Sequence, residues 1–313
     1  MVPLPSRRLE WTVRLYVGCF LVFLAAPLAA ACLFAFNDST FPSLPWRGFT
    51  LDWFFGRAEP KLGLLHDRRL VRSIGVSAAT GAAVAVLATA IGLGNAFLFE
   101  RCRFPLKRLL YVIMIVPLVI PGIVLGLSIL VLANATATAL QAATGVDPAF
   151  LRPGAPLVVL GQLSFLVTVS TLILGARLAK FDRAQEEAAL NLGAGWARVM
   201  GTITLPFLKP AILSSLIVCF LVSFENFTTT LMLVGSDPPL TVAMYDRMSK
   251  AGSTPVLNAV SLLLVAGCAV LALASILVQR EAKPRREASA APVARDAAVP
   301  VPAPCHATVG SLS

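Results

Sequence analysis

Long apolar stretches alternate with short polar segments along most of the chain. Residues 73–99 contain no charged side chain over 27 positions, which exceeds the roughly 20 apolar residues that a helix needs to cross a bilayer. Five further stretches are also largely apolar, and we predict a membrane-spanning helix for each. The six predicted spans are residues 13–36, 73–99, 109–133, 156–175, 210–234 and 256–278. The pattern therefore predicts an all-α polytopic membrane helical bundle with six transmembrane helices.

Composition supports a membrane protein. The 313-residue chain is 57% hydrophobic and only 13% charged, whereas a soluble domain carries about 25% charged residues. In a soluble protein, the formal net charge of +10 would suggest a nucleic-acid partner. Here many basic residues flank the apolar spans, and no continuous basic face with interleaved aromatic residues occurs. We therefore attribute the charge to membrane topology and expect contact with membrane lipid, but not with nucleic acid.

The positions of lysine and arginine predict that residues 1–12 and 280–313 are cytoplasmic. Basic clusters follow the second and sixth spans: Arg101, Arg103, Lys107 and Arg108, and then Arg280, Lys283, Arg285 and Arg286. Residues 37–72 form a predicted periplasmic loop, with Trp46 and Trp53 as interfacial anchors. This loop is an exception to the rule because it carries six Lys/Arg residues. The Ala/Pro/Val-rich residues from 280 to 313 are expected to be a disordered tail.

The six cysteines show neither CxxC spacing nor a Cys/His pattern. We interpret them as small apolar fillers, so neither a disulfide framework nor a metal site is expected. The sequence also lacks a G-x4-G-K-[S/T] phosphate-binding motif. This chain is therefore not expected to hydrolyse ATP, and no catalytic residue or cofactor is predicted for it.

Residues 180–210 form the only long, polar, helix-prone interval between two spans. Good helix formers occupy positions 184–192, and Asp182 precedes them as a candidate N-cap. Gly193 and Gly195 then allow the backbone to turn. An amphipathic helix lying on the membrane surface is a second interpretation of this interval. Its three- and four-residue spacing predicts one small apolar ridge, formed by Leu190, Ala194 and Ala197.

A longer motif lies within the same interval. The run Glu187, Ala188 and Ala189 is followed after three residues by Gly193, and after nine more by Ile203, Leu205 and Pro206. This spacing resembles the EAA loop of the membrane subunits of bacterial ABC importers, so residues 180–210 are called the EAA loop below. In that family the loop forms a coupling helix that docks into a cytoplasmic ATPase subunit. The resemblance implies that these seven residues couple the chain to such an ATPase.

The resemblance extends over roughly residues 13–280. Within this family, the chain is most similar to the spermidine/putrescine-type branch of permeases. The segments that carry it are 49–54 (FTLDWF), 223–235 (SFENFTTTLMLVG), 240–245 (LTVAMY) and 255–260 (PVLNAV). It implies a five-helix permease core over residues 73–279 and the fold of a type I ABC importer permease in the bacterial inner membrane. Implied partners are cytoplasmic subunits that bind ATP, a second permease subunit and a periplasmic solute-binding protein.

The fifth span contains the polar pair Glu225 and Asn226. Placing a charged carboxylate inside the apolar core of a bilayer costs free energy. Three interpretations of Glu225 remain open. Glu225 is a buried acid hydrogen-bonded to a neighbouring helix, a pathway residue that favours a cationic solute, or an acid already in water because the helix ends early. Pro117 and Pro121 in the third span predict a kink, which is either structural or part of the pathway.

Polyamines such as spermidine or putrescine are the solutes that the resemblance favours. Polyamine permeases often carry paired acids where this chain has Glu225 and Asn226, so aminophosphonates and opines remain alternatives. A secondary transporter needs several intramembrane ionisable groups or an inverted repeat, and only Glu225 is deep. A membrane enzyme needs a cluster of catalytic groups, and the sequence shows none in or beside the spans.

Overall fold

The computed structural model describes residues 7–42, 44–58, 61–252 and 254–281. These residues are predominantly helical and contain no β-strand; an isolated antiparallel bridge joins Asn37 and Phe49. The predicted all-α class is confirmed. Beyond Glu281, the predicted disordered tail lies outside the described residues. The helices are α1 (Arg7–Phe34), α2 (Asp52–Phe55), α3 (Arg68–Arg101), α4 (Lys107–Val119), α5 (Gly122–Thr144), α6 (Ala155–Leu178), α7 (Ala184–Asn191), α8 (Trp196–Val199), α9 (Leu205–Glu225), α10 (Thr228–Leu233), α11 (Leu240–Ala251) and α12 (Pro255–Glu281). A 3-10 turn, Ala149–Leu151, precedes α6, and a π-helical turn, Met200–Thr204, precedes α9.

Six helical segments are long and apolar enough to cross a membrane, as predicted. They are Leu9–Phe34, Arg68–Arg101, Gly122–Thr144, Ala155–Leu178, Trp196–Glu225 and Pro255–Leu273. In the fifth predicted span, residues 210–234, α9 ends at Glu225 and the short α10 follows, so the polar pair Glu225 and Asn226 coincides with a helix end.

The third predicted span, residues 109–133, was also wrong as one continuous helix. It is divided between α4 and α5, and Ile120 at the junction has the extended ψ of 132°. A proline disfavours helical geometry in the residue before it, and Pro121 follows Ile120. Pro117 remains inside α4. Pro121 therefore produces a break rather than a kink.

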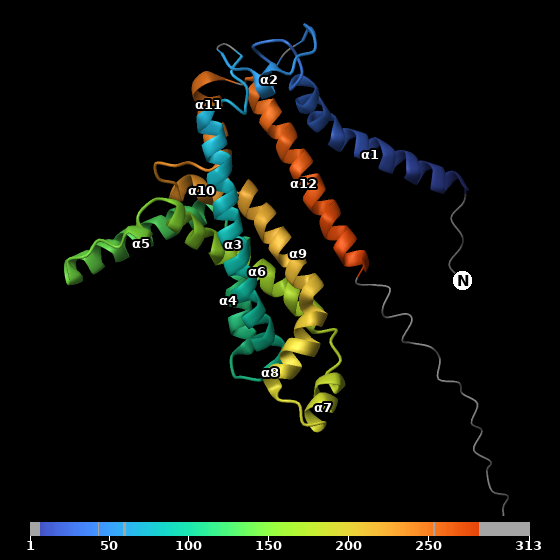
Figure 1. Cartoon of the computed structure of the whole chain (residues 1–313), viewed down its shortest axis with the longest axis vertical. Helices are drawn as coiled ribbons and strands as arrows, with labels where there is room; N and C mark the ends of the chain where they lie inside the picture. The colour runs from blue at the N-terminus through green and yellow to red at the C-terminus, as the bar shows by residue number, and fades with distance from the viewer. Residues whose placement is uncertain (1–6, 43, 59–60, 253, 282–313) are drawn as a thin grey trace, which may run out of the picture.

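Helix α3 runs through the middle of the molecule and packs along α6 and α9 (Figure 1). Its small residues allow this approach: Ala85 and Ala88 are buried together with Leu166 of α6 and Cys219 of α9. The prediction that residues 73–99 pack in the bundle centre is confirmed. Close approach of small residues is a common way for helices to associate in lipid, where the hydrophobic effect does not drive association.

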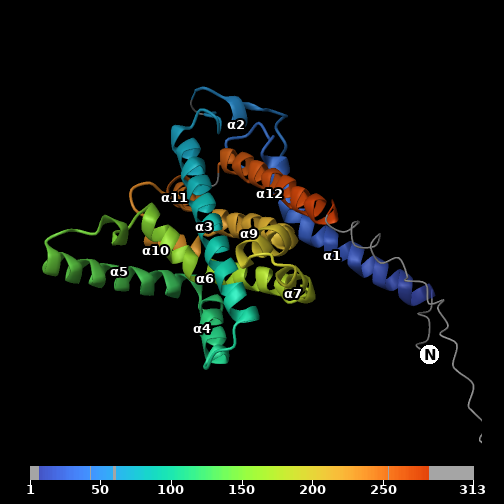
Figure 2. The ribbon, with the colours of Figure 1, turned by 60° about the horizontal axis from the view of Figure 1, so that its bottom comes forward.

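Helices α1 and α5 project away from this centre (Figures 1 and 2). Large apolar side chains along both helices are exposed, including Phe23 on α1 and Leu132 on α5. Helix α5 contacts the rest of the bundle near Gly126, which lies against the backbone of Thr229 in α10. In a bilayer, such outward apolar faces contact lipid tails or another membrane subunit.

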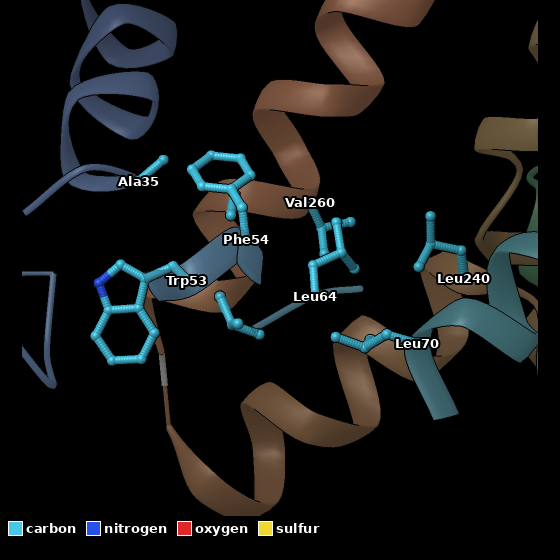
Figure 3. Packing of buried hydrophobic residues seen from close by; sticks show 9 residues of the cluster. Ala35, Trp53, Phe54, Leu64, Leu70, Leu240 and Val260 are labelled. Atoms are coloured by element: carbon cyan, nitrogen blue, oxygen red, sulfur yellow. The ribbon is translucent and has the colours of Figure 1, made fainter. Parts of the chain in front are cut away.

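The two ends of the bundle differ. Helices α7 and α8 lie at one end near the last turn of α3, whereas α2 and α11 lie at the opposite end (Figure 1). At the α2 end, Trp53 and Phe54 join a buried cluster with Val260 of α12 (Figure 3). The Trp53 indole N–H donates to the carbonyl of Asn37 at 2.9 Å. The prediction of Trp53 as an interfacial anchor was wrong, because this side chain fixes the loop to the bundle core.

Ion pairs offset part of the positive charge between α1 and α3. Lys61 pairs with Asp38 and, at 3.4 Å, with Asp52. The hydrogen bond to Asp38 raises the pKa of the Lys61 ammonium group above its ordinary value. Arg72 reaches across to Asp237 at 2.8 Å. Lys61 and Arg72, two of the six basic residues in the predicted loop, are thus paired with acids.

Candidate functional site

The EAA loop contains two short helices, α7 and α8, which are separated by a turn. The Asp182 carboxylate accepts a hydrogen bond from the Ala184 N–H at 3.0 Å. It thus satisfies a donor in the first turn of α7, from one residue before the N-cap position, which is Arg183. Gly193 has a φ of +85°, a conformation that costs residues with a side chain. The predicted turn is therefore present. Gly195 has a φ of −70° and a ψ of 150°, so its backbone conformation does not require glycine.

The residues of the EAA motif fall into two groups. Glu187 and Ala188 are exposed on α7, Ala189 is half-buried there, and Gly193 is exposed at the turn. Ile203 lies in the π-helical turn and packs against the cluster formed by Leu178, Phe181 and Leu208. Leu205 and Pro206 form the first turn of α9. The first group thus presents a surface at the end of the molecule, and the second joins that surface to a long helix.

The predicted ridge was wrong, because its residues do not share one helix. Leu190 is on α7, Ala194 is in the turn and Ala197 is on α8. The most exposed large apolar side chains here are Leu192, at 89%, and Trp196, at 68%. We interpret these two exposed side chains as a candidate contact surface. Two large apolar residues on either side of a glycine turn were the sequence signal for this surface.

Glu186, the residue before the EAA motif, anchors α7 to the bundle. Arg101 at the end of α3 donates two hydrogen bonds to its carboxylate, at 2.8 and 3.0 Å. The two side chains are only 19% and 16% exposed. Thr204, the last residue of the π-helical turn, donates its hydroxyl to the same carboxylate. Sequence reasoning missed this contact because Arg101 and Glu186 are 85 positions apart.

A second group of polar residues surrounds the break between α9 and α10. The Asn226 side-chain oxygen accepts hydrogen bonds from the Thr230 N–H and hydroxyl, at 3.3 and 3.1 Å. Glu225 is exposed at the end of α9 and has no hydrogen-bond or ion-pair partner among the described residues. This arrangement matches a helix that ends early and does not match a buried, hydrogen-bonded acid. A role of Glu225 in the solute pathway stays a prediction.

Gln162 of α6 fixes this break from the side. Its amide nitrogen donates to the Thr230 hydroxyl at 2.9 Å and to the Ser223 carbonyl at 3.4 Å. The Ser223 hydroxyl donates in return to its amide oxygen. Gln162 is only 1% exposed, so each of these bonds is made away from water. Sequence reasoning missed this residue; a lone glutamine in an apolar span was the available signal.

The break at Pro121 lies beside the break at Asn226. A Cβ on Gly122, the first residue of α5, would be 2.3 Å from the Thr228 hydroxyl oxygen at the start of α10. The structure thus brings Pro121 near the Glu225 region, while Pro117 lies one turn earlier in α4. Helix ends leave backbone carbonyls without partners in their own helix. No group of three His, Cys, Asp or Glu residues that could hold a metal ion occurs within the described ranges.

Residues 88–283 match the family described as "Binding-protein-dependent transport system inner membrane component". The putrescine transport system permease protein PotI of Escherichia coli K12 is 26% identical over 284 residues, which cover 90% of this chain and 95% of PotI. The spermidine/putrescine permease PotC of Haemophilus influenzae is 24% identical over 259 residues, covering 83% of this chain and 93% of PotC. The molybdenum permease ModB of E. coli K12 is 34% identical over 167 residues, covering 52% of this chain and 72% of ModB.

Solved structures show the same fold. The crystal structure of a bacterial ABC transporter that imports alginate matches with a TM-score of 0.63 and 15% identity, over 88% of this chain and 94% of that chain. A bacterial alginate transporter in complex with an alginate-pentasaccharide-bound periplasmic protein matches with a TM-score of 0.67 and 16% identity, over 88% and 95% of the two chains. The predicted permease fold is confirmed. This chain belongs to the family of binding-protein-dependent transport system inner membrane components, the multi-pass permease subunits of ABC importers.

Proposed function

We propose that this ABC importer permease translocates a polyamine, such as putrescine or spermidine, delivered by a periplasmic solute-binding protein. One observation carries the proposal: the similarity to a putrescine permease extends over 90% of the chain. The similarity to the molybdenum permease covers 52%, which is consistent with a shared permease core and a different solute.

Glu225 supports a cationic solute. Its exposed carboxylate lies where α9 ends, near the break at Pro121. A carboxylate attracts an ammonium group, and the attraction strengthens where the solute displaces water and the effective dielectric constant falls. Carbonyl groups released at the helix breaks are further acceptors for ammonium N–H donors. In this proposal Glu225 and Asn226 lie on the solute pathway, and Pro117 and Pro121 shape its wall.

The end of the bundle that holds α7 and α8 is the cytoplasmic end in this proposal. Both termini are then cytoplasmic, and Leu192 and Trp196 dock into a groove of an ATP-binding subunit. Glu187 makes a polar contact at that interface, and Gly193 permits the tight turn within it. A second permease subunit covers the exposed apolar faces of α1 and α5. ATP is bound by the partner subunits, and this chain carries no cofactor.

Transport then follows from movement of the EAA loop. Closure of the ATP-binding subunits displaces α7 and α8, and the rigid turn from Ile203 to Pro206 transmits the displacement to α9. Because α9 ends at Glu225, its movement changes the geometry of the break where we place the solute. Alternating access thus depends on force generated outside this chain.

Labelled putrescine uptake by the reconstituted transporter tests the solute proposal. We expect unlabelled spermidine and putrescine to compete, and an aminophosphonate, an opine and molybdate to leave uptake unchanged. Glu225→Gln should raise the KM for putrescine about tenfold, equivalent to about 1.4 kcal/mol. Glu10→Gln, an exposed acid on α1, is the matched control and should have no effect. Competition by an anionic solute alone, with Glu225→Gln unchanged, would contradict the proposal.

A further inference from the structure

Three side chains from distant parts of the sequence meet at the base of the EAA loop. Arg101 belongs to the last turn of α3, Glu186 to the first turn of α7, and Thr204 to the π-helical turn before α9. Glu186 accepts hydrogen bonds from both partners, two from the guanidinium group and one from the hydroxyl. We propose that Arg101, Glu186 and Thr204 form a latch that delivers movement of the coupling helix to α3 and α9 together. This inference rests on the proposed coupling to an ATP-binding subunit.

The geometry favours a directional mechanical connection over an incidental surface ion pair. Exposed ion pairs are weak and easily rearranged, but these side chains are 19% and 16% exposed, and Thr204 is fully buried. A bidentate arginine–carboxylate contact fixes orientation as well as distance. The Arg101 guanidinium also lies 5.4 Å from the centre of the Phe181 ring. This contact further restricts the conformations that the Arg101 side chain can adopt.

The partners of the latch are the helices that a transport movement must reach. Helix α3 runs through the bundle centre, and α9 continues from Thr204 to the break at Glu225. The π-helical geometry of Met200–Thr204 is a further indication, because π-turns inside helices occur frequently at functional sites. Without the latch, α7 remains joined to α9 through the chain and to α3 through the Arg183 contact with the Glu100 carbonyl at 2.7 Å. Loss of the latch should therefore loosen α7 without releasing it.

Substitutions in the complete transporter separate a latch from a merely structural contact. Glu186→Gln keeps the shape of the side chain and removes its charge, whereas Thr204→Val keeps the ion pair and removes the link to α9. For both variants we expect ATP hydrolysis and assembly with the ATP-binding subunits to persist. Solute transported per ATP hydrolysed should fall about tenfold for Glu186→Gln, a usual size for coupling between sites, and less for Thr204→Val. Combining Arg101→Glu with Glu186→Arg should recover most of the loss that either change causes alone.

Arg103→Gln is the matched control, because Arg103 is an exposed arginine two residues from Arg101. It should leave the transport-to-hydrolysis ratio unchanged. An unchanged ratio in Glu186→Gln would overturn the latch, as would a proportional fall of hydrolysis and uptake with loss of assembly. The second outcome would assign Glu186 to folding alone. If the wild-type chain does not assemble with an ATP-binding subunit, the proposed function fails, and this inference fails with it.

A distance measurement tests the same inference without relying on activity. Spin labels are placed on the exposed Cys102 and on Gln185→Cys, in a chain whose other cysteines are replaced. The latch predicts one narrow distance distribution that is the same with and without ATP, because α7 and the end of α3 move together. In Glu186→Gln the distribution should broaden and become dependent on ATP. A wild-type distance that changes with ATP would overturn the proposal.

Discussion

Gly193 and Gly195 lie two residues apart in one exposed turn, yet φ is +85° at Gly193 and −70° at Gly195. A Cβ built on either residue would have no neighbour within 4 Å, so substitution acts through the backbone alone. A residue with a side chain pays about 1–2 kcal/mol for left-handed geometry. The turn that separates α7 from α8 therefore depends on Gly193 and not on Gly195.

Gly193→Leu is predicted to uncouple ATP hydrolysis from uptake while leaving membrane insertion intact, because the altered turn displaces α8 relative to α7. Gly195→Leu, its matched control, should retain coupling. Uptake and hydrolysis measured side by side in proteoliposomes check this prediction. Normal transport by Gly193→Leu would count strongly against the assignment of this turn to the coupling surface.

Replacing Leu192 or Trp196 by serine should weaken binding of the ATP-binding subunit. Burying a large apolar side chain contributes about 1.5–3 kcal/mol, so each change should reduce affinity by roughly 10- to 100-fold. The fold should be unaffected, because both side chains are exposed in this chain. The measurement is the affinity of the ATP-binding subunit for the permease held in nanodiscs. Phe41→Ser, an exposed apolar residue near the opposite end, is the control and should bind normally.

Gly92→Val should destabilise the contact between α3 and α6. A Cβ on Gly92 would lie 2.3 Å from the Ser170 hydroxyl oxygen and 3.0 Å from the Thr171 backbone nitrogen. Relieving this steric clash therefore requires movement of the α6 backbone, at a cost of about 1–3 kcal/mol. Thermal unfolding of the purified transporter should show a lower midpoint. Gly94→Val, where a Cβ has no neighbour within 4 Å, should unfold like the wild type.

Gln162→Leu should destabilise the break between α9 and α10. The substitution removes the acceptor of the Ser223 hydroxyl, whereas the Thr230 hydroxyl loses one partner and keeps its bond to Asn226. Leaving the buried Ser223 hydroxyl unpaired costs about 1–3 kcal/mol. We expect a lower unfolding midpoint together with reduced putrescine uptake. Gln141→Leu is the control, because Gln141 is exposed and its side chain accepts a hydrogen bond from Arg152 at the surface. Unchanged stability in Gln162→Leu would show that this network does not support the break.

Features that depend on neighbours in the sequence were predictable. Asp182 and Gly193 act within a few residues of their own positions, so their capping and turning roles followed from residue type. The apolar spans followed from length and hydrophobicity. Pro121 showed where a helix is interrupted, but its effect was underestimated, because a kink and a full break have the same local sequence signal.

Features that depend on distant contacts were not predictable from one sequence. Neither Glu186 nor Arg101 differs visibly from other charged residues near a membrane, and only the fold brings them together. Trp53 is a residue type common at membrane interfaces and lies in a predicted loop, yet tertiary packing buries it (Figure 3). Glu225 lies inside an apolar run, but α9 ends there beside a hydrogen bond from Gln162 in another helix to the Ser223 carbonyl.

Reconstitution tests the central claim, that this chain moves solute by force received at α7 and α8. The purified permease pair should transport labelled solute into liposomes when its ATP-binding subunits, its binding protein and ATP are all present. Omitting the ATP-binding subunits should abolish transport, whatever ion gradient is imposed. Solute accumulation by this chain alone, driven by a proton or sodium gradient, would contradict the account.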